Sequence, residues 1–450
     1  MVCDADKNLG LALFPRSISN DLAYTQLHKA CMQVQPQTCL ADTWNSQCMV
    51  VDIINHHFHQ SDVTSKQKDY ILSRVGTSAI GSFRIRPKIH KVPLDGRPIF
   101  NFTHSWLQPV AMFLCEALDP LVQQCAHEVQ HFLNQWTLPK DPDVVSLVDD
   151  VKQLYPGLEH DHIMNIVSGK LRRHYCNKPS YATLVINLIG TVLRCPYTAF
   201  EGTIWKAICG IGTGLACGAQ LANICMDDFD KFVQEAPSPY GRYIDDCICI
   251  LPPDRVSQFF IRANAWHPSI TVEQAAMGRS NVPYLDIAIS LSSANQFTFE
   301  LYRKPMNLYQ YLPRASCHRP SVFASFTRGE AIRIMRRCSS CRVAQKHLSI
   351  FKLHLIKRGY SSLEIDVAFD RAHLIQSVPI RHNSATVRKV FLKVRHSSTV
   401  NYKSISRAIS RHSHLLNGSC KIACASTAQR NIFRLLYSST WRPDKLAVGG

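Results

Sequence analysis

Carboxylates stand at two places in this sequence where an apolar, β-prone run stops. The run Val144–Val148 is followed directly by Asp149 and Asp150, and the stretch RYIDDCICIL places Asp245 and Asp246 between two short β-prone runs, as the tip of a hairpin would. Buried carboxylates are normally paired or bound to a metal, and Mg²⁺ prefers oxygen ligands. Strand-end carboxylates that face each other could hold two ions about 3.5 to 4 Å apart, an arrangement suited to phosphoryl transfer. Taken alone, an Asp-Asp pair is more often an ordinary turn.

The flanking segments have patterns that would position these acids. Residues Ala79–Phe102 alternate apolar and basic side chains around a Pro/Gly turn, which predicts a basic β-hairpin, and Trp106–Gln130 has helical spacing. Residues 214–234 carry apolar side chains at helical spacing after a glycine cluster, which predicts a helix opened by a flexible loop. The C-terminal third is mostly helical in pattern, with basic faces at Ala331–Arg358 and Val387–His414.

Composition and charge narrow the class of protein. The chain has 450 residues, 46% hydrophobic and 19% charged, which fits roughly two to four packed modules and excludes a disordered or fibrous protein. Its net charge of +18 is uneven, because residues 301–450 contain 27 Lys and Arg against 5 Asp and Glu, whereas residues 1–300 contain 24 against 28. A block this basic favours nucleic acid as a partner. The sequence shows no signal-peptide pattern and no apolar run near the roughly 18 residues of a membrane span, so we expect a soluble, unsecreted protein with no membrane partner.

The motifs, taken in order, resemble those of reverse transcriptases. YIDD (Tyr243–Asp246) looks like the Y-x-D-D box of that family, and DVKQLY (Asp150–Tyr155) looks like its first catalytic-aspartate box. RPKIHK with RPI resembles the fingers segment that holds the incoming nucleotide, and GIGTGLACGAQLAN resembles the glycine-containing loop and helix between the two aspartate boxes. Further stretches are similar to Penelope-like retroelement reverse transcriptases: ADKNLG, PYLDIAI, LYRKPMNLYQYLPRASCHRPS, RIMRRCS, SISRAISRHSHLL and LYSSTWRPDKL. The GIY-YIG endonuclease that many relatives carry after the thumb has no counterpart in this sequence.

This resemblance implies an α+β right-hand polymerase fold with fingers, a palm built on an antiparallel sheet, and a helical thumb. Residues 1–140 would form the fingers and N-terminal region, and residues 141–300 the palm, with a fingers insertion at about 158–205. Residues 301–450 would form the basic, mostly helical thumb and C-terminal region.

The resemblance also implies roles for individual palm residues. Asp150 and Asp245 would be metal-binding carboxylates, the backbone carbonyl of Val151 would be a further ligand, and Asp246 would be the supporting second acid. Tyr155 would be the aromatic residue that abuts the sugar of the incoming nucleotide and excludes a 2′-hydroxyl.

Three further residues would lie at the nucleotide site, and one of the acidic positions has an alternative. Arg97, with Lys88 as a second candidate, would contact the triphosphate, although Lys88 could equally be a solvated hairpin lysine. Gly214 would let the backbone approach the templating base pair, because it has no Cβ. Asp149 is the alternative to Asp150, and we prefer Asp150 because Tyr155 then has the spacing found in the family.

Two departures from the family pattern concern the nucleotide site. Thr213 stands where Gln or Met is usual, which leaves the shape of the loop open. No lysine occurs between Lys231 and Lys304, so the lysine often proposed as a proton donor to pyrophosphate has no obvious equivalent, and His267 is one alternative.

We therefore expect an RNA-directed DNA polymerase of a retroelement. It would use two Mg²⁺ ions and deoxynucleoside triphosphates to extend the 3′ end of a DNA primer along an RNA template. Its location would be nuclear or cytoplasmic, and we favour the nucleus. Two alternatives stay open: a catalytically inactive retroelement remnant that binds RNA or DNA, and a maturase-like RNA chaperone.

Overall fold

The structure is a computed structural model, and it describes residues 2–4, 11–89, 91–122, 133, 143–212, 214–234, 239–292, 296–376, 388–395 and 420–427. Contacts divide the chain into two compact units, Cys3–Lys304 and Pro305–Gly450. The residue limits of fingers, palm and thumb stay a prediction. The motif ADKNLG, Thr213 and the two most C-terminal motifs similar to Penelope-like elements lie outside the described residues.

The N-terminal part of the first unit contains a basic β-hairpin. Its elements are β1 (Val2–Asp4), β2 (Leu11–Leu13), α1 (Arg16–Ala30), β3 (Cys31–Val34), α2 (Pro36–His59), α3 (Ser65–Leu72), β4 (Gly81–Lys88), β5 (Asp95–Asn101), α4 (Leu107–Leu118) and the short 3-10 helix η2 (Asp119–Leu121). β4 and β5 pair antiparallel from Ser82 opposite Asn101 to Lys88 opposite Asp95, which confirms the predicted hairpin. Phe83 and Ile85 face the core while Arg84 is exposed between them, as the alternating pattern requires.

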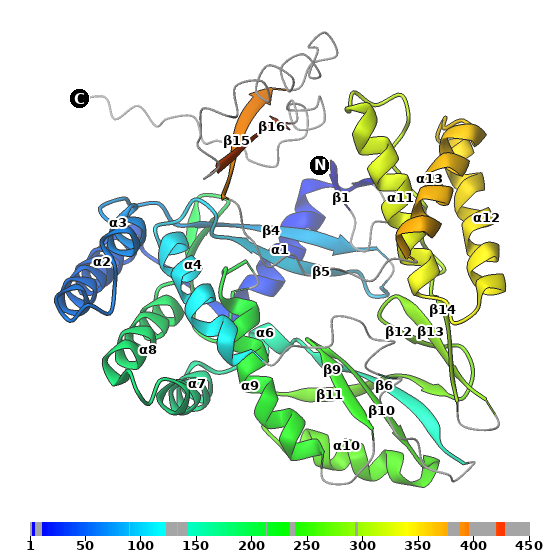
Figure 1. The fold of residues 1–450 in the computed structure, drawn as a ribbon. Helices are drawn as coiled ribbons and strands as arrows, with labels where there is room; N and C mark the ends of the chain where they lie inside the picture. The colour runs from blue at the N-terminus through cyan, green and yellow to red at the C-terminus, as the bar shows by residue number, and fades with distance from the viewer. Residues whose placement is uncertain are drawn as a thin grey trace. The chain divides into compact units, whose positions relative to one another are not determined.

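A five-stranded sheet joins this hairpin, labelled β4 and β5 in Figure 1, to a later part of the sequence. After the helices α7 (His160–His174) and α8 (Pro179–Arg194), the chain forms β7 (Tyr197–Phe200) and β8 (Thr203–Ala207), and the strand order is β3-β8-β7-β4-β5. The segment predicted as a fingers insertion therefore contributes two strands to the sheet of the hairpin. The predicted helix at Trp106–Gln130 is α4 and η2 as far as the described residues extend.

A four-stranded antiparallel sheet carries the acidic motifs. Its strands are β6 (Val145–Lys152), β9 (Tyr240–Tyr243), β10 (Asp246–Leu251) and β11 (Thr271–Gly278), in the order β11-β6-β10-β9. The helices around it are α6 (Leu154–Gly157), α9 (Gly218–Val233), the 3-10 turn η3 (Pro253–Arg255) and α10 (Val256–Asn264). The predicted helix at 214–234 is thus confirmed, with its first turn at Gly218.

Both faces of this sheet are packed, but against different elements. Leu147, Val151 and Cys247 share a core cluster with Leu221 and Phe229 of α9, so α9 covers one face. On the other face, Val148 and Ile248 pack with residues of a three-stranded sheet made of β12 (Val282–Tyr284), β13 (Ile287–Leu291) and β14 (Phe297–Leu301). Alternation along β6 therefore sends successive side chains into two separate environments.

The described part of the second unit is mainly helical. α11 (Pro320–Arg336), α12 (Cys341–Lys357) and α13 (Ser362–Gln376) contact one another, and a short connection at 337–340 divides the predicted basic helix into α11 and α12. The helical prediction for Val387–His414 is wrong at β15 (Arg388–Arg395), which pairs in parallel with β16 (Cys420–Thr427). The segment RKVFLKVR is rich in β-branched and aromatic residues, which favours a strand. No helix among the described residues is both long enough and apolar enough to cross a membrane.

Candidate active site

Strand register brings the two acidic parts of the sequence together. β10 pairs with β6 so that Asp246 lies directly opposite Asp150, and Asp245 lies at the tip between β9 and β10. The backbone N–H of Val151 donates to the carbonyl oxygen of Asp245 at 2.9 Å, which joins the hairpin tip to β6. The three predicted catalytic acids therefore lie at neighbouring strand ends.

The two adjacent aspartates of β6 point to opposite faces. The Asp149 side chain lies on the face covered by α9 and is fully buried, whereas the side chain of Asp150 is 34% exposed. Burial raises the pKa of the Asp149 carboxyl to about 7; the Cys247 thiol acts against this, and the negative charges of Asp150 and Asp246 add to it. Asp150 is thus the aspartate of this pair that a metal or substrate could reach, which supports the predicted register.

The hairpin tip has a strained backbone that buried contacts hold in place. Ile244 has φ +61°, a left-handed conformation that costs a β-branched residue roughly 1–2 kcal/mol. The Arg242 side chain, 4% exposed, donates from Nη1 to the Ile244 carbonyl at 2.9 Å and from Nε and Nη2 to the two carboxylate oxygens of Asp230 on α9, each at 2.8 Å. Arg242 therefore fixes the turn that presents Asp245.

Charges and rings around Asp245 come from three parts of the sequence. Burial raises the pKa of the Asp245 carboxyl, the negative charge of Asp150 adds to this, and the guanidinium of Arg97 on β5 opposes it. Burial also raises the pKa of Tyr155 on α6, with a further contribution from Asp245. The fold thus brings together four of the predicted site residues, Asp150, Asp245, Arg97 and Tyr155.

Lys88 is engaged within the hairpin. Its Nζ donates to Asp95 Oδ2 at 2.7 Å across the β4–β5 pair, and Asp95 also accepts from Gln26 of α1 at 3.0 Å. Burial alone would raise the pKa of Asp95, but the hydrogen bonds from Lys88 and the Gly96 backbone, together with the charges of Lys88 and Lys29, outweigh it and the pKa is lowered. Triphosphate contact by Lys88 stays a prediction, and it would require this ion pair to open.

Gly214 allows a close backbone approach within the protein. A Cβ at this position would lie 1.6 Å from the carbonyl oxygen of Phe100 on β5. Gly210, with φ +72°, similarly runs against the backbone of Tyr155 and Pro156. The missing Cβ at Gly214 thus lets the loop before α9 pack on the hairpin strand, and approach to a templating base pair stays a prediction.

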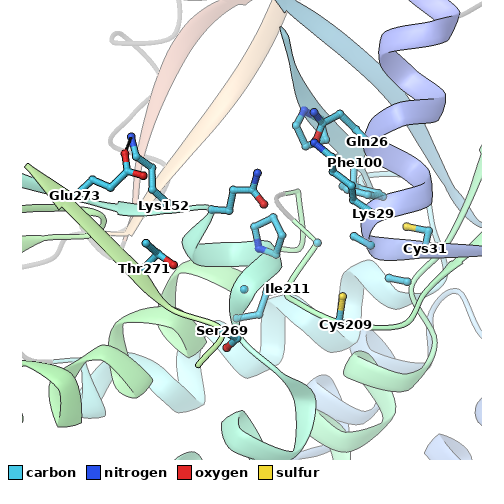
Figure 2. A pocket seen from close by; sticks show the side chains of 17 residues that line it. Gln26, Lys29, Cys31, Phe100, Lys152, Cys209, Ile211, Ser269, Thr271 and Glu273 are labelled. Carbon is cyan, nitrogen blue, oxygen red and sulfur yellow. Dashed lines mark ion pairs between the residues drawn. The ribbon is translucent and has the colours of Figure 1, made fainter. Parts of the chain in front are cut away.

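A cavity of about 470 Å³ lies next to Lys152, at the end of β6 (Figure 2). Its wall is formed by α1, β5, the end of β6, α6, the loop after β8 and the start of β11. Figure 2 shows Lys152 and Glu273 on one side and Gln26, Lys29 and Phe100 on the other. The Nζ of Lys152 lies 3.1 Å from Asp150 Oδ2 and 3.2 Å from Glu273 Oε2, so one residue that lines the cavity contacts a predicted metal ligand.

Two features of this site were missed from the sequence. Lys152 has the spacing from Asp150 that puts both on one face of a strand, and that signal was available. The partners Glu273 and Asp230 are remote in sequence and carry no local signal. The Nδ1 of His267, the alternative proton donor, lies 2.7 Å from Ser269 Oγ, and the His267 ring packs on the His162 ring with 4.2 Å between centroids.

The donor set at the acids fits a hard divalent cation. Among the described residues, no group of three or more His, Cys, Asp or Glu side chains is placed to hold a metal ion. Asp150 and Asp245 offer carboxylate oxygens and Val151 a backbone carbonyl, while substrate phosphates and water would complete the octahedral shell that Mg²⁺ prefers. Burial is the main cause of the raised pKa of Asp245, and the negative charge of Asp150 adds to it.

Comparisons with known proteins bear on the fold. No protein-family model matches the sequence, and no characterised protein matches it significantly. Among solved structures, telomerase from Candida albicans in complex with the TWJ fragment of telomeric RNA has a TM-score of 0.51 at 9% identity, over 93% of this chain and 65% of that one. The chain has a right-hand polymerase fold.

The polymerase fold confirms the predicted fold class. Apo telomerase from Candida tropicalis, truncated from the C-terminal domain, matches with a TM-score of 0.40 at 15% identity, over 66% of this chain and 63% of that one. The chain spans 62% to 65% of the length of the telomerase chains that it matches. The assignment of segments to palm and fingers stays a prediction, and under that prediction we refer to the sheet β11-β6-β10-β9 as the palm sheet and to β4–β5 as the fingers hairpin. The closer resemblance to Penelope-like elements stays a prediction.

Proposed function

We propose that the chain is an RNA-directed DNA polymerase, a reverse transcriptase of a retroelement of the Penelope-like type. It would extend the 3′ end of a DNA primer on an RNA template with deoxynucleoside triphosphates. The observation that carries the proposal is the accessible Asp150 beside Asp245 at neighbouring strand ends, with Arg97 of the fingers hairpin close enough to influence Asp245.

Each site residue has a chemical task in this proposal. Asp150 and Asp245, with the Val151 carbonyl, would hold two Mg²⁺ ions, and Asp246 would support them. When bound, these ions supply electrostatic stabilisation of the attacking and leaving oxygens. Arg97 would clamp the triphosphate with its planar pair of donors.

Sugar selection would fall to Tyr155, whose ring is half-buried and close enough to Asp245 for the two to interact electrostatically. A ring under the sugar of the incoming nucleotide leaves no room for a 2′-hydroxyl. The selection would be steric, so it would require neither a charged group nor a hydrogen bond from Tyr155 to the sugar.

Nucleic acid is the proposed macromolecular partner. The basic charge of the chain is concentrated in residues 301–450, and exposed Arg342 and Lys346 stand one helical turn apart on α12. The Candida albicans telomerase that shares this fold is bound to an RNA fragment, which supports RNA as one partner. A nuclear location, close to chromosomal DNA, is part of the same proposal.

A primer-extension assay tests the proposal. An annealed RNA template and DNA primer are incubated with the protein and deoxynucleoside triphosphates, with and without Mg²⁺, and a DNA template is tested in parallel. Asp150→Asn and Asp245→Asn should lower synthesis about 1,000-fold or more, because each removes a charged metal ligand, while primer–template affinity stays within several-fold.

Two further variants serve as controls. Asp254→Asn removes an exposed carboxylate beyond the opposite end of β10 and should leave synthesis unchanged. Asp149→Asn should also retain synthesis, since Asp149 is buried beneath α9. Nucleic-acid binding by the wild type without Mg²⁺-dependent synthesis would instead identify an inactive remnant or a maturase-like chaperone.

A further inference from the structure

One ammonium group is shared between the predicted metal site and the strand beside it. Lys152 follows Asp150 by two residues on β6, so both side chains leave the palm sheet on the same face. Glu273 lies directly opposite Asp150 on β11. The Lys152 Nζ lies 3.1 Å from Asp150 Oδ2 and 3.2 Å from Glu273 Oε2, and thus bridges the two strands.

The contact between the Lys152 ammonium and Asp150 is weak enough for a metal ion to replace it. The side chains of Lys152, Asp150 and Glu273 are 39%, 34% and 59% exposed, and ion pairs this open to water contribute only about 0–1 kcal/mol each. A divalent cation binding Asp150 carries twice the charge of the ammonium and competes for the same oxygens. Glu273 does not lie in the predicted metal site, so it can retain the ammonium when Asp150 is taken.

The Lys152 ammonium, once displaced from Asp150, could contact a ligand in the cavity. Lys152 and Glu273 both line it, and Lys29 of α1 lies across from them (Figure 2). Among the described residues that line the cavity, Lys29 and Lys152 are the cationic ones. Because the sequence has no lysine between Lys231 and Lys304, β11 cannot contribute a lysine to the cavity wall. It contributes Glu273, and the lysine on this side of the cavity is Lys152 of β6.

We propose that Lys152 is an exchangeable counter-ion of the active site. With no metal bound, it neutralises Asp150; when metal and nucleotide arrive, it stays anchored to Glu273 and donates to the phosphate groups of a nucleoside triphosphate. An ammonium has three donors, so one can remain on Glu273 while others reach a phosphate. This inference rests on the proposed function, and it assigns to Lys152 and Glu273 a part in nucleotide binding.

The two halves of the proposal predict opposite effects of one substitution. Lys152→Met removes the competitor for Asp150, so Mn²⁺ should bind the nucleotide-free protein about 3- to 5-fold more tightly. The same variant loses a charge-assisted contact to phosphate, so a deoxynucleoside triphosphate should bind the enzyme–primer–template complex about 10-fold more weakly. A residue with a merely structural role would not move these two constants in opposite directions.

The experiment measures both constants without requiring turnover. Free Mn²⁺ is followed by electron paramagnetic resonance during titration, and nucleotide binding by equilibrium dialysis. Lys152→Arg should restore both constants, because it keeps the charge. Lys29→Met removes a charge from the opposite wall without touching Asp150, and should leave the Mn²⁺ constant unchanged. Glu273→Gln should weaken nucleotide binding, because the ammonium loses its anchor.

The outcomes separate this inference from the proposed function. Unchanged or weaker Mn²⁺ binding in Lys152→Met, or unchanged nucleotide binding, overturns the counter-ion role whether or not the wild type synthesises DNA. A wild type that makes no DNA with Mg²⁺ overturns the proposed function instead, and the Mn²⁺ titration still decides whether Lys152 competes for Asp150. Thermal melts of each variant identify any that fails to fold, and Lys152→Arg then supplies the comparison.

Discussion

Arg242 is the residue that links the β9–β10 turn, which carries Asp245, to helix α9. Its guanidinium makes a two-pronged ion pair with Asp230, a hydrogen bond of 2.9 Å to the Ile244 carbonyl and one of 3.0 Å to Asn223 Oδ1. These contacts link the turn that presents Asp245 to helix α9. We predict that Arg242→Met lowers both stability and the rate of nucleotide addition.

The size of the effect follows from the burial of the pair. Removing one member of a buried ion pair costs about 3–5 kcal/mol, because the other charge is left uncompensated. The Asp230 side chain is 24% exposed and also accepts from Tyr240 Oη at 2.9 Å, which lowers the cost toward about 2 kcal/mol. The unpartnered Ile244 carbonyl adds about 1 kcal/mol, so we expect a total of about 3 kcal/mol.

Catalysis should suffer beyond this loss of stability. A displacement of a catalytic group by about 1 Å can cost roughly 100-fold in rate, and the strained Ile244 backbone has reason to relax once its carbonyl is released. We therefore expect kcat for single-nucleotide addition to fall about 100-fold in Arg242→Met, with a much smaller change in primer–template affinity. Urea denaturation and single-turnover kinetics measure the two effects.

Two comparisons make the test specific. Arg242→Lys restores the charge but not the planar fork, so it should recover part of the stability and little of kcat. Arg255→Met removes an exposed guanidinium of η3 and should change neither. If Arg242→Met loses less than about 1 kcal/mol, or keeps a normal kcat, then the tip does not depend on this network and the reasoning fails.

Three other predictions concern sugar selection, pH and salt. Tyr155→Val should increase ribonucleotide incorporation relative to deoxyribonucleotide incorporation in competition assays, since a steric barrier is removed; unchanged selectivity would count against the register. Burial raises the pKa of Asp149 from 3.8 to about 7, so the wild type should lose stability as the pH rises from about 4 through 7. In urea denaturation without metal, Asp149→Asn should be more stable than the wild type by on the order of 1–3 kcal/mol at pH 8, but not at pH 4. Duplex affinity should fall steeply with salt, and changing both Arg342 and Lys346 to Gln should reduce the log-log slope by roughly two phosphate contacts; a salt-insensitive complex would contradict the basic interface.

The local elements of this protein follow from its sequence. Alternating apolar and basic residues around a Pro/Gly turn predicted the fingers hairpin, and apolar spacing after a glycine cluster predicted α9. The position of Asp245 at a hairpin tip was also predictable, because two β-prone runs flank it. These features depend on interactions between near neighbours in the chain, so the sequence pattern carries them. The exception is β15, where a segment predicted to be helical forms a strand, as its β-branched and aromatic residues favour.

What residue pattern alone left open was the choice between Asp149 and Asp150. Alternation along a strand requires these side chains to point to opposite faces, but it does not say which face is covered. Packing of α9 on one face buries Asp149 and leaves Asp150 accessible. The bridge from Lys152 to Glu273 and the clamp from Arg242 to Asp230 likewise join segments that are far apart in the chain. Only the tertiary structure decides such contacts, because burial and charge pairing depend on which distant segments meet.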